Sequence, residues 1–247
     1  MGFETIAYVA AIFLLAGTVK GVVGLGLPTI SMGLLALSMA PAQAAALLIV
    51  PTVLTNIWQA GPMSTLMPLL KRLGPMQWAI AAGTLGGALV FGAPAGLWAS
   101  GALGAALVVY ALWGLWGATP IVSSHTERWL GPVSGFLTGI ITAVTGVVVI
   151  PAVPYLQALA LDKQALIQSM GLSFSVATIA LGLGLWMNQS YSVHHLGVST
   201  LMLIPALLGM MLGSRLRGVL SPSIFRRLLL LSLLALGLYQ VVRALNA

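Results

Sequence analysis

Lys20-Gly-Val-Val-Gly-Leu-Gly-Leu-Pro28 places three glycines and a proline within nine residues of an otherwise apolar run. Each glycine weakens a helix interior by about 1 kcal/mol, and a proline removes a backbone hydrogen bond. The second half of the chain repeats this disturbance in residues 139–151, where Thr142, Thr145 and Gly146 interrupt another apolar run. We therefore predict that helices are broken at two places.

The composition indicates that lipid surrounds the chain. Of its 247 residues, 60% are apolar and 5% are charged, whereas an ordinary soluble domain has about 25% charged residues. A bilayer core about 30 Å thick accepts runs of roughly 20 apolar residues and excludes unpaired backbone groups, which favours helices. Residues 225–244 show none of the alternation of a barrel strand. The predicted fold class is an all-α membrane protein, a polytopic helical bundle.

Charged residues, prolines and glycines divide the chain into ten apolar segments. These segments cover residues 5–19, 22–40, 42–60, 75–93, 99–118, 129–144, 146–161, 164–187, 194–213 and 224–244. The first and second segments of each half barely reach across the bilayer core at about 1.5 Å per residue. We therefore expect about 8–10 membrane segments, some of them broken or folded back as re-entrant hairpins.

The basic residues predict how the chain is oriented. If all ten segments cross the membrane, nine of the ten Lys and Arg residues fall on one side, and only Arg243 stands apart. The nine are Lys20, Lys71, Arg72, Arg128, Lys163, Arg215, Arg217, Arg226 and Arg227. The positive-inside rule places their connections in the cytoplasm and both termini outside the cell inner (plasma) membrane. The net charge of +7 is scattered and forms no basic stripe for nucleic acid.

The two halves of the chain resemble each other. Gly17-Thr-Val-Lys-Gly21 corresponds to Gly135-Phe-Leu-Thr-Gly139. We therefore predict two repeats, residues 1–120 and 121–247, with five apolar segments in each. An odd number of crossings turns the second repeat upside down relative to the first, as in many secondary transporters. As an alternative, glycines at this spacing only permit close helix packing, as small-xxx-small motifs do.

The broken helices and one polar helix face predict where a solute binds. The N-terminus of a half-helix carries a partial positive charge that suits an anion. Lys20, a cation at membrane depth, either pairs with that anion or reaches the headgroups from its segment end. Thr52, Thr55, Asn56 and Gln59 share one helix face, although isolated Ser and Thr often bond their own helix. The predicted substrate-binding residues are Lys20, Gly24, Gly26, Pro28, Thr52, Asn56, Gln59, Thr142, Thr145, Gly146, Gln168 and Ser173.

The remaining reactive side chains favour no catalytic or metal chemistry. The acidic residues, Glu4, Glu127 and Asp162, lie at segment ends or in loops, so a mid-membrane carboxylate for proton or sodium coupling is missing. Cysteine is absent, and the adjacent His194 and His195 diverge by about 100° on a helix, which disfavours a shared metal. No nucleophile stands with a base in one span. We therefore expect no enzyme activity, no cofactor and no metal.

The two glycine motifs resemble those of the TauE/SafE family of sulfite exporters, also called the TSUP group. The resemblance rests on residues 16–26 and on the counterpart from Gly135 through Gly146 to Pro151, and it extends over essentially the whole chain. It implies an inner-membrane permease for sulfur-containing or carboxylate anions such as sulfite, sulfoacetate or thiosulfate. The chain departs from many members at Leu27-Pro28 and Val147-Val148, where a denser glycine run is common.

These observations together predict a secondary transporter, an exporter or an uptake permease, for small anions. Sulfite, sulfonates and other organosulfur or carboxylate anions are the expected solutes, and alternating access about one central site is the expected mechanism. The expected partners are the anionic solute and the bilayer, and an assembly of several copies is compatible with the sequence. A passive anion channel, a non-transporting membrane subunit and an intramembrane enzyme remain as alternatives.

Overall fold

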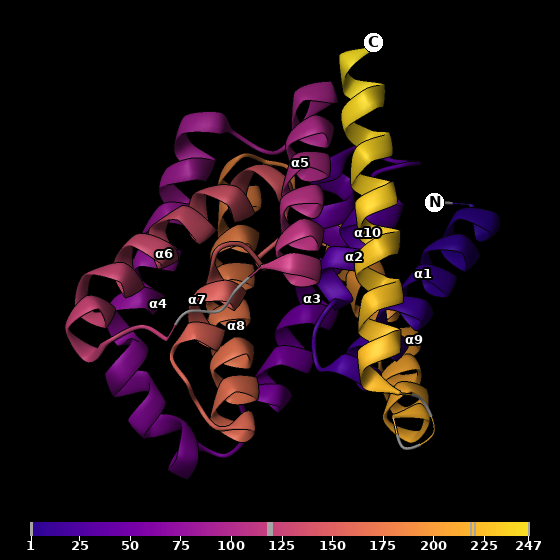
Figure 1. Cartoon of the computed structure of the whole chain (residues 1–247). Helices are drawn as coiled ribbons and strands as arrows, with labels where there is room; N and C mark the ends of the chain where they lie inside the picture. Colours follow the sequence, from indigo (N-terminus) through magenta and orange to yellow (C-terminus); the bar gives the residue numbers. More distant parts are fainter. Residues whose placement is uncertain (1, 118–120, 218, 220, 247) are drawn as a thin grey trace.

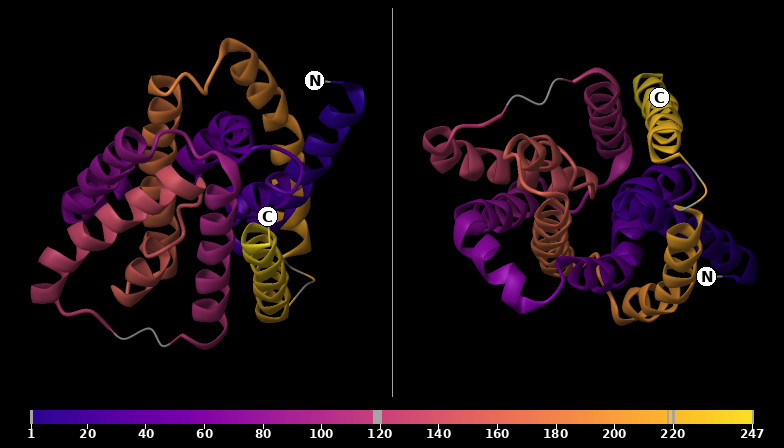
Figure 2. Two further views of the ribbon diagram at one scale, coloured as in Figure 1. Left: turned by 90° about the horizontal axis from the view of Figure 1, so that it is seen from above. Right: turned by 60° about the horizontal axis from the view of Figure 1, so that its bottom comes forward.

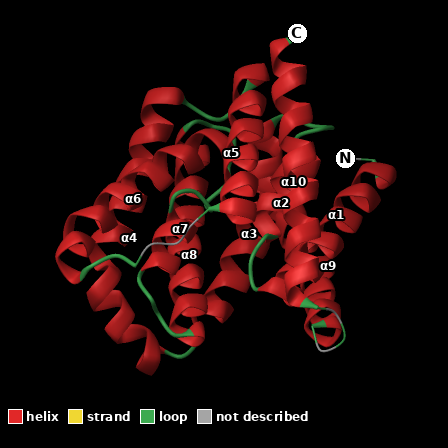
Figure 3. Ribbon diagram, viewed as in Figure 1, coloured by secondary structure: helices red, strands yellow, loops and turns green. Residues whose placement is uncertain are grey.

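The computed structural model describes residues 2–117, 121–217, 219 and 221–246, which form ten helices and no strand (Figures 1 and 3). The helices are α1 (Phe3–Val23), α2 (Leu27–Leu35), α3 (Pro41–Ala60), α4 (Met63–Phe91), α5 (Gly96–Trp116), α6 (Ser124–Thr145), α7 (Ala152–Ala158), α8 (Lys163–Met187), α9 (Val193–Leu216) and α10 (Pro222–Leu245). The predicted all-α class with ten segments is confirmed. Residue 118, the expected end of the fifth segment, and residue 120, the expected end of the first repeat, lie outside the described residues.

Six of the helices are long and apolar enough to cross a membrane, namely α1, α3, α5, α8, α9 and α10. The 29-residue α4 and the 22-residue α6 are also long enough, but they are less apolar. α2 has nine residues and α7 has seven, so they reach only about 14 Å and 11 Å at 1.5 Å per residue. Neither helix alone can cross a bilayer core of about 30 Å.

Three helices differ most from their predicted bounds. α4 begins at Met63 rather than at residue 75, because the helix continues through Lys71, Arg72 and Pro75. A proline forgoes one helical hydrogen bond without necessarily ending the helix, and the two charges lie within the first three turns. α2 and α7 are shorter than the predicted 22–40 and 146–161, because the glycine- and proline-containing stretches before them are not helical.

The ends of the bundle separate the connections into two groups. The bottom of Figure 1 holds the α3–α4 and α7–α8 connections, the end of α9 and the start of α10. Its upper half holds the α4–α5 and α8–α9 connections, the start of α1 and the end of α10. Lys163 begins α8 and Arg215 lies in the last turn of α9, so both belong to the lower end. This grouping agrees with the sorting of charges predicted from the sequence. Which side of the membrane this end faces stays a prediction.

Two pairs of parallel helices pack through glycines, at opposite flanks of the molecule (Figures 1 and 2). On one flank, Gly17 and Gly21 of α1 lie directly against the backbone of α9, at Ala206 and Met210. On the other flank, Gly135 and Gly139 of α6 lie against the backbone of α4 at Met76 and Ile80. The interpretation of both glycine pairs as close-packing motifs is therefore confirmed. Small residues let the two backbones approach, as expected in lipid.

Two further pairs are antiparallel and join the first five helices to the last five. In α8, Gly171 lies against Asn56 and Ala60 of α3, and Gly182 lies against Ile49. In the same way, α5 and α10 run in opposite directions along their contact. Each pair would contain equivalent helices of the two predicted repeats, and inversion requires such equivalents to be antiparallel. The packing supports the inverted repeat, which stays a prediction.

A hydroxyl group from α9 bonds a backbone carbonyl of α3 that has no partner within its own helix. Pro51 lies inside α3, and because proline has no N–H, the carbonyl of Leu47 loses its helical partner. The Ser199 hydroxyl donates to the Leu47 carbonyl oxygen at 2.8 Å, and the Val50 N–H donates to the Ser199 hydroxyl at 3.1 Å. Ser199 is fully buried. The proline is therefore tolerated because a neighbouring helix satisfies the backbone.

Replacing Ser199 with alanine is expected to lower the free energy of unfolding by about 1–3 kcal/mol, because the Leu47 carbonyl is then buried without a partner. Thr200→Ala is the matched control, since the exposed Thr200 hydroxyl bonds only the Leu196 carbonyl of its own helix. Its expected effect is within about 0.5 kcal/mol. Denaturation of both purified variants in detergent measures the difference. Equal stability of the two variants would mean that the Ser199 hydroxyl does not stabilise the Leu47 carbonyl.

Candidate functional site

The first predicted helix break lies between α1 and α2. α1 ends at Val23, and Gly24 follows with φ +83° while its N–H bonds the Lys20 carbonyl at 2.8 Å. Gly26 precedes α2 with φ +113°. Both values lie in the left-handed region that favours glycine. Pro28 then occupies the first turn of α2, where its missing N–H costs little.

Side chains from other helices hold the backbone of this break. Arg217, at the end of α9, donates to the carbonyl oxygens of Gly21 and Val22, the latter at 2.9 Å. The Gln59 amide of α3 donates to the carbonyls of Gly24 at 2.9 Å and of Ile167 at 3.2 Å. The break therefore survives because its carbonyls are paired inside the protein, as a lipid environment requires.

Lys20 is a buried cation. It lies in the last turn of α1 rather than in a connection, and its side chain is 3% exposed. Its ammonium group donates to the Thr55 hydroxyl at 3.1 Å and to the Asn56 side-chain carbonyl. These contacts favour the alternative in which Lys20 pairs with the anion over the one in which it reaches the headgroups.

Among the residues that the structure describes, no carboxylate pairs with Lys20. Within the described part of the chain the only ion pair joins Arg72 to Glu127, at 2.7 Å. Asp162 accepts from the backbone N–H groups at the start of α8, at 2.8 and 2.9 Å. Because a buried charge is costly without a partner, Lys20 is a candidate contact for an anion from outside the chain.

Three other polar atoms of α3 have free hydrogen-bonding capacity. Thr52 Oγ1, Asn56 Nδ2 and Gln59 Oε1 are buried and have no partner among the described residues. Leaving such a group unpaired costs about 1–3 kcal/mol. Of the predicted polar face of α3, Thr55 and Asn56 contact Lys20 and Gln59 contacts the break, while the Asn56 amide remains available as a donor.

A cavity of about 350 Å³ opens beside Lys20, and we call it the Lys20 cavity. Its polar lining comes from Lys20, Gly24, Thr55, Gln59, Ser214 and Arg217. α9 adds an apolar wall with Leu207, Met210 and Met211. Among the described residues, two cationic side chains and no carboxylate line this cavity, a lining that suits an anion.

The second predicted break follows α6, but its polar groups are already paired. Gly146 caps α6 with φ +70°, and the Thr142 hydroxyl donates to the Thr138 carbonyl at 2.7 Å. Thr145 donates to the carbonyl of Ile141 at 2.6 Å. The two hydroxyl groups therefore bond carbonyls of their own helix, as isolated Ser and Thr residues often do.

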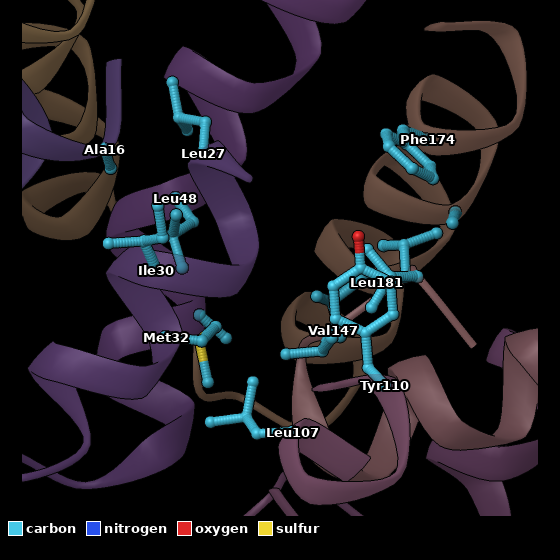
Figure 4. Packing of buried hydrophobic residues seen from close by; sticks show 14 of the residues in the cluster. Ala16, Leu27, Ile30, Met32, Leu48, Leu107, Tyr110, Val147, Phe174 and Leu181 are labelled. Atoms are coloured by element: carbon cyan, nitrogen blue, oxygen red, sulfur yellow. The ribbon is translucent and has the colours of Figure 1, made fainter. Parts of the chain in front are cut away.

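The second break packs against α2 through apolar side chains. Gly146 lies against Met32 of α2, and Met32, Leu107 and Val147 belong to one buried cluster (Figure 4). Thr142, Thr145 and Gly146 are not among the residues that line the Lys20 cavity. The structure thus brings the two breaks close through α2, while the first break alone borders this cavity.

The predicted residues of α8 connect helices. Gln168 donates to the Ala60 carbonyl at 3.0 Å and to the Thr65 hydroxyl at 2.8 Å, which ties α8 to the α3–α4 connection. Ser173 accepts from the Gln77 amide of α4 at 3.0 Å. Gln77 is buried and was not predicted as a site residue. A glutamine within an otherwise apolar helix, as at Gln59, was the sequence signal that could have identified Gln77.

Another cavity, of about 400 Å³, lies between α4, α6 and α7. Arg72 and Arg128 line it, but so does Glu127, which forms a two-pronged pair with Arg72 at 2.7 and 2.8 Å. An internal carboxylate already neutralises one cation there. The Lys20 cavity is therefore the better candidate for an anion.

Comparison with known proteins identifies the family of the chain. Residues 9–240 match the family described as sulfite exporter TauE/SafE. No curated protein and no solved structure matches the chain. The matched range contains both broken helices and both glycine pairs, so the resemblance of the sequence motifs is confirmed. The chain belongs to the TauE/SafE family of sulfite exporters.

Proposed function

We propose that this membrane protein is a secondary transporter that binds a small anion in the Lys20 cavity and moves it by alternating access. Sulfite, sulfonates and other organosulfur or carboxylate anions are the proposed solutes, in keeping with the family. The observation that carries the proposal is that Lys20 is buried without a carboxylate and lines a cavity that Arg217 also lines. Two cations around one cavity favour an anion over a neutral or cationic solute.

The donors of the cavity suit an oxyanion. The ammonium of Lys20 supplies charge, while the planar guanidinium of Arg217 retains N–H groups beyond those that bond the α1 carbonyls. A volume of about 350 Å³ lies at the small end of the range of ligand pockets. We propose that the anion accepts from the Lys20 ammonium and from the free N–H groups of Arg217.

The break supplies the moving part in this proposal. The α1 backbone stays packed against α9, whereas α2 is joined to α1 only through residues 24–26. Rotation about Gly24 and Gly26 moves α2 without disturbing the α1–α9 contact. Transporters with broken helices at the solute site support such gating by analogy.

Purified protein in lipid vesicles tests the function. We expect saturable uptake of sulfite, a sulfonate or a small carboxylate, well above that of empty vesicles. Flux that rises linearly with concentration would instead indicate a channel. Absence of flux for all three anion classes, with correctly inserted protein, would overturn the proposal.

The proposed orientation places the lower end of the bundle in Figure 1 in the cytoplasm and both termini outside the inner membrane. The basic residues at that end support it. Single cysteines are informative because the chain has none of its own. Labelling of a cysteine at residue 221 only after the membrane is permeabilised is expected, and labelling in intact cells would refute the orientation.

Replacing Arg217 with glutamine is expected to raise the anion concentration for half-maximal transport about tenfold, because one charge-assisted contact in the cavity is lost. Arg215→Gln is the matched control, since Arg215 ends the same helix but does not line the cavity. Vesicle uptake over a range of anion concentrations measures both variants. An equal shift in both would point to surface charge rather than to binding.

A further inference from the structure

We propose that a cavity between α5 and α10 binds the phosphate group of an anionic phospholipid. This cavity has a volume of about 380 Å³ and lies where the end of α5 meets the start of α10. Gly114 and Trp116 of α5 line it together with Ser223, Arg226, Arg227 and Leu230 of α10. The two helices are antiparallel neighbours (Figure 1). The inference rests on this cavity and not on the proposed transport.

The cavity concentrates positive charge that the chain leaves unpaired. Arg226 and Arg227 are adjacent, and neither forms an ion pair within the described residues. Both lie near the N-terminus of α10, where the helix adds a partial positive charge, and Ser221 provides no side-chain cap there. None of the three acidic side chains of the protein lines this cavity. An anion at this position relieves repulsion between the two guanidinium groups.

Phosphate matches the donors better than a simple halide does. A guanidinium group presents paired N–H donors in a fork that fits two oxygens of one phosphate. Two neighbouring arginines can therefore engage several oxygens at once. The Ser223 hydroxyl, 3.0 Å from the hydroxyl of Ser221, lies at the same place as a further donor.

The surroundings indicate that the phosphate belongs to a lipid. Trp116 is 71% exposed and Leu231 is 43% exposed, and both line the cavity. α5 and α10 are among the helices that can cross the membrane, so exposed side chains at their ends are expected to contact lipid. Aromatic residues favour the level of the headgroups, and basic pockets between membrane helices bind anionic lipid headgroups. A free phosphate ion would leave this apolar border without a partner.

Native mass spectrometry of the purified protein tests the inference, with phosphatidylglycerol and phosphatidylcholine as competing probes. The wild type is expected to retain phosphatidylglycerol preferentially. Arg226→Gln/Arg227→Gln is expected to weaken that retention about thirtyfold, roughly fivefold for each arginine near an anionic lipid. Lys71→Gln/Arg128→Gln removes the same number of charges from the same end outside this cavity, and it should retain the lipid as the wild type does.

A lysine variant and a competition with inorganic phosphate distinguish a lipid phosphate from simple charge attraction and from free phosphate. Arg226→Lys/Arg227→Lys keeps the charges that orient the helix but removes the forks, so it should retain phosphatidylglycerol more weakly than the wild type and more strongly than the glutamine variant. Millimolar inorganic phosphate should not displace the lipid. Equal retention of both lipids by the wild type, unchanged retention by the glutamine variant, or full displacement by inorganic phosphate would each overturn the lipid assignment.

Discussion

Lys20→Met is expected to lower anion transport about a hundredfold while the protein still inserts and folds. Methionine keeps the apolar stem of lysine, so the packing of α1 changes little. It removes the charge that is bonded to Thr55 and Asn56 and that lines the cavity. A hundredfold loss corresponds to about 2.8 kcal/mol, within the range for hydrogen bonds to charged groups. Initial uptake rates in vesicles measure it.

Lys71→Met is the matched control, because Lys71 is an exposed cation in the first half of α4 that does not line the Lys20 cavity. Its transport rate should remain within about twofold of the wild type, since an exposed charge contributes little. Lys20→Arg keeps the charge but carries a larger head, so it should transport slowly and bind the anion. If Lys20→Met transports like Lys71→Met, the anion does not use this cavity.

Gly139→Ala is expected to lower the free energy of unfolding by about 3 kcal/mol, the upper range for overpacking. A Cβ atom at Gly139 would stand 2.6 Å from the Thr84 amide nitrogen and 2.8 Å from the Gly83 carbonyl carbon. These are backbone atoms, which cannot rotate away as a side chain can. The α4 and α6 backbones would have to separate.

Gly86→Ala is the control for this substitution. Gly86 lies in α4 as well, but nothing stands within 4 Å of a Cβ atom there. Alanine should then leave stability unchanged or raise it by up to about 1 kcal/mol, through its higher helix propensity. Thermal unfolding of the two variants in detergent separates them. Similar melting temperatures would mean that α4 and α6 do not pack closely through Gly139.

Local signals in the sequence predicted much of the fold. Positive φ at Gly24, Gly26 and Gly146 explains why the glycine and proline clusters interrupt the helices, and the spacing of Thr52, Asn56 and Gln59 places them on one face of α3. The start of α4 at Met63 was not predicted, because the segment was expected to begin only at residue 75, after the charges of Lys71 and Arg72. A single proline is weak evidence when the flanking residues favour a helix.

Contacts between segments far apart in the sequence could not be predicted from the residue pattern of any one segment. Arg217 appeared only as a topology signal, since nothing near it in the sequence indicates that it bonds Gly21 and Val22 nearly 200 residues away. Ser199 and the proline that it compensates are separated in the same way. The sequence also suggested that both breaks border one site, whereas only the first lines the Lys20 cavity. The contacts of Arg217 and Ser199 and the positions of the two breaks depend on which helices pack together. The residue pattern of one segment does not determine that packing.

The glycine contact between α1 and α9 also fixes a mechanical register. Gly213 of α9 lies against Thr18 and Gly21 of α1, and Arg217 follows one helical turn later, beside the same stretch of α1. A slip of α9 by one turn, about 5.4 Å, would carry the guanidinium away from the α1 carbonyls. The packing of α9 on α1 therefore sets the position of Arg217 along α1. In the proposed transporter, a bulky side chain at Gly213 is expected to alter anion affinity without touching the anion.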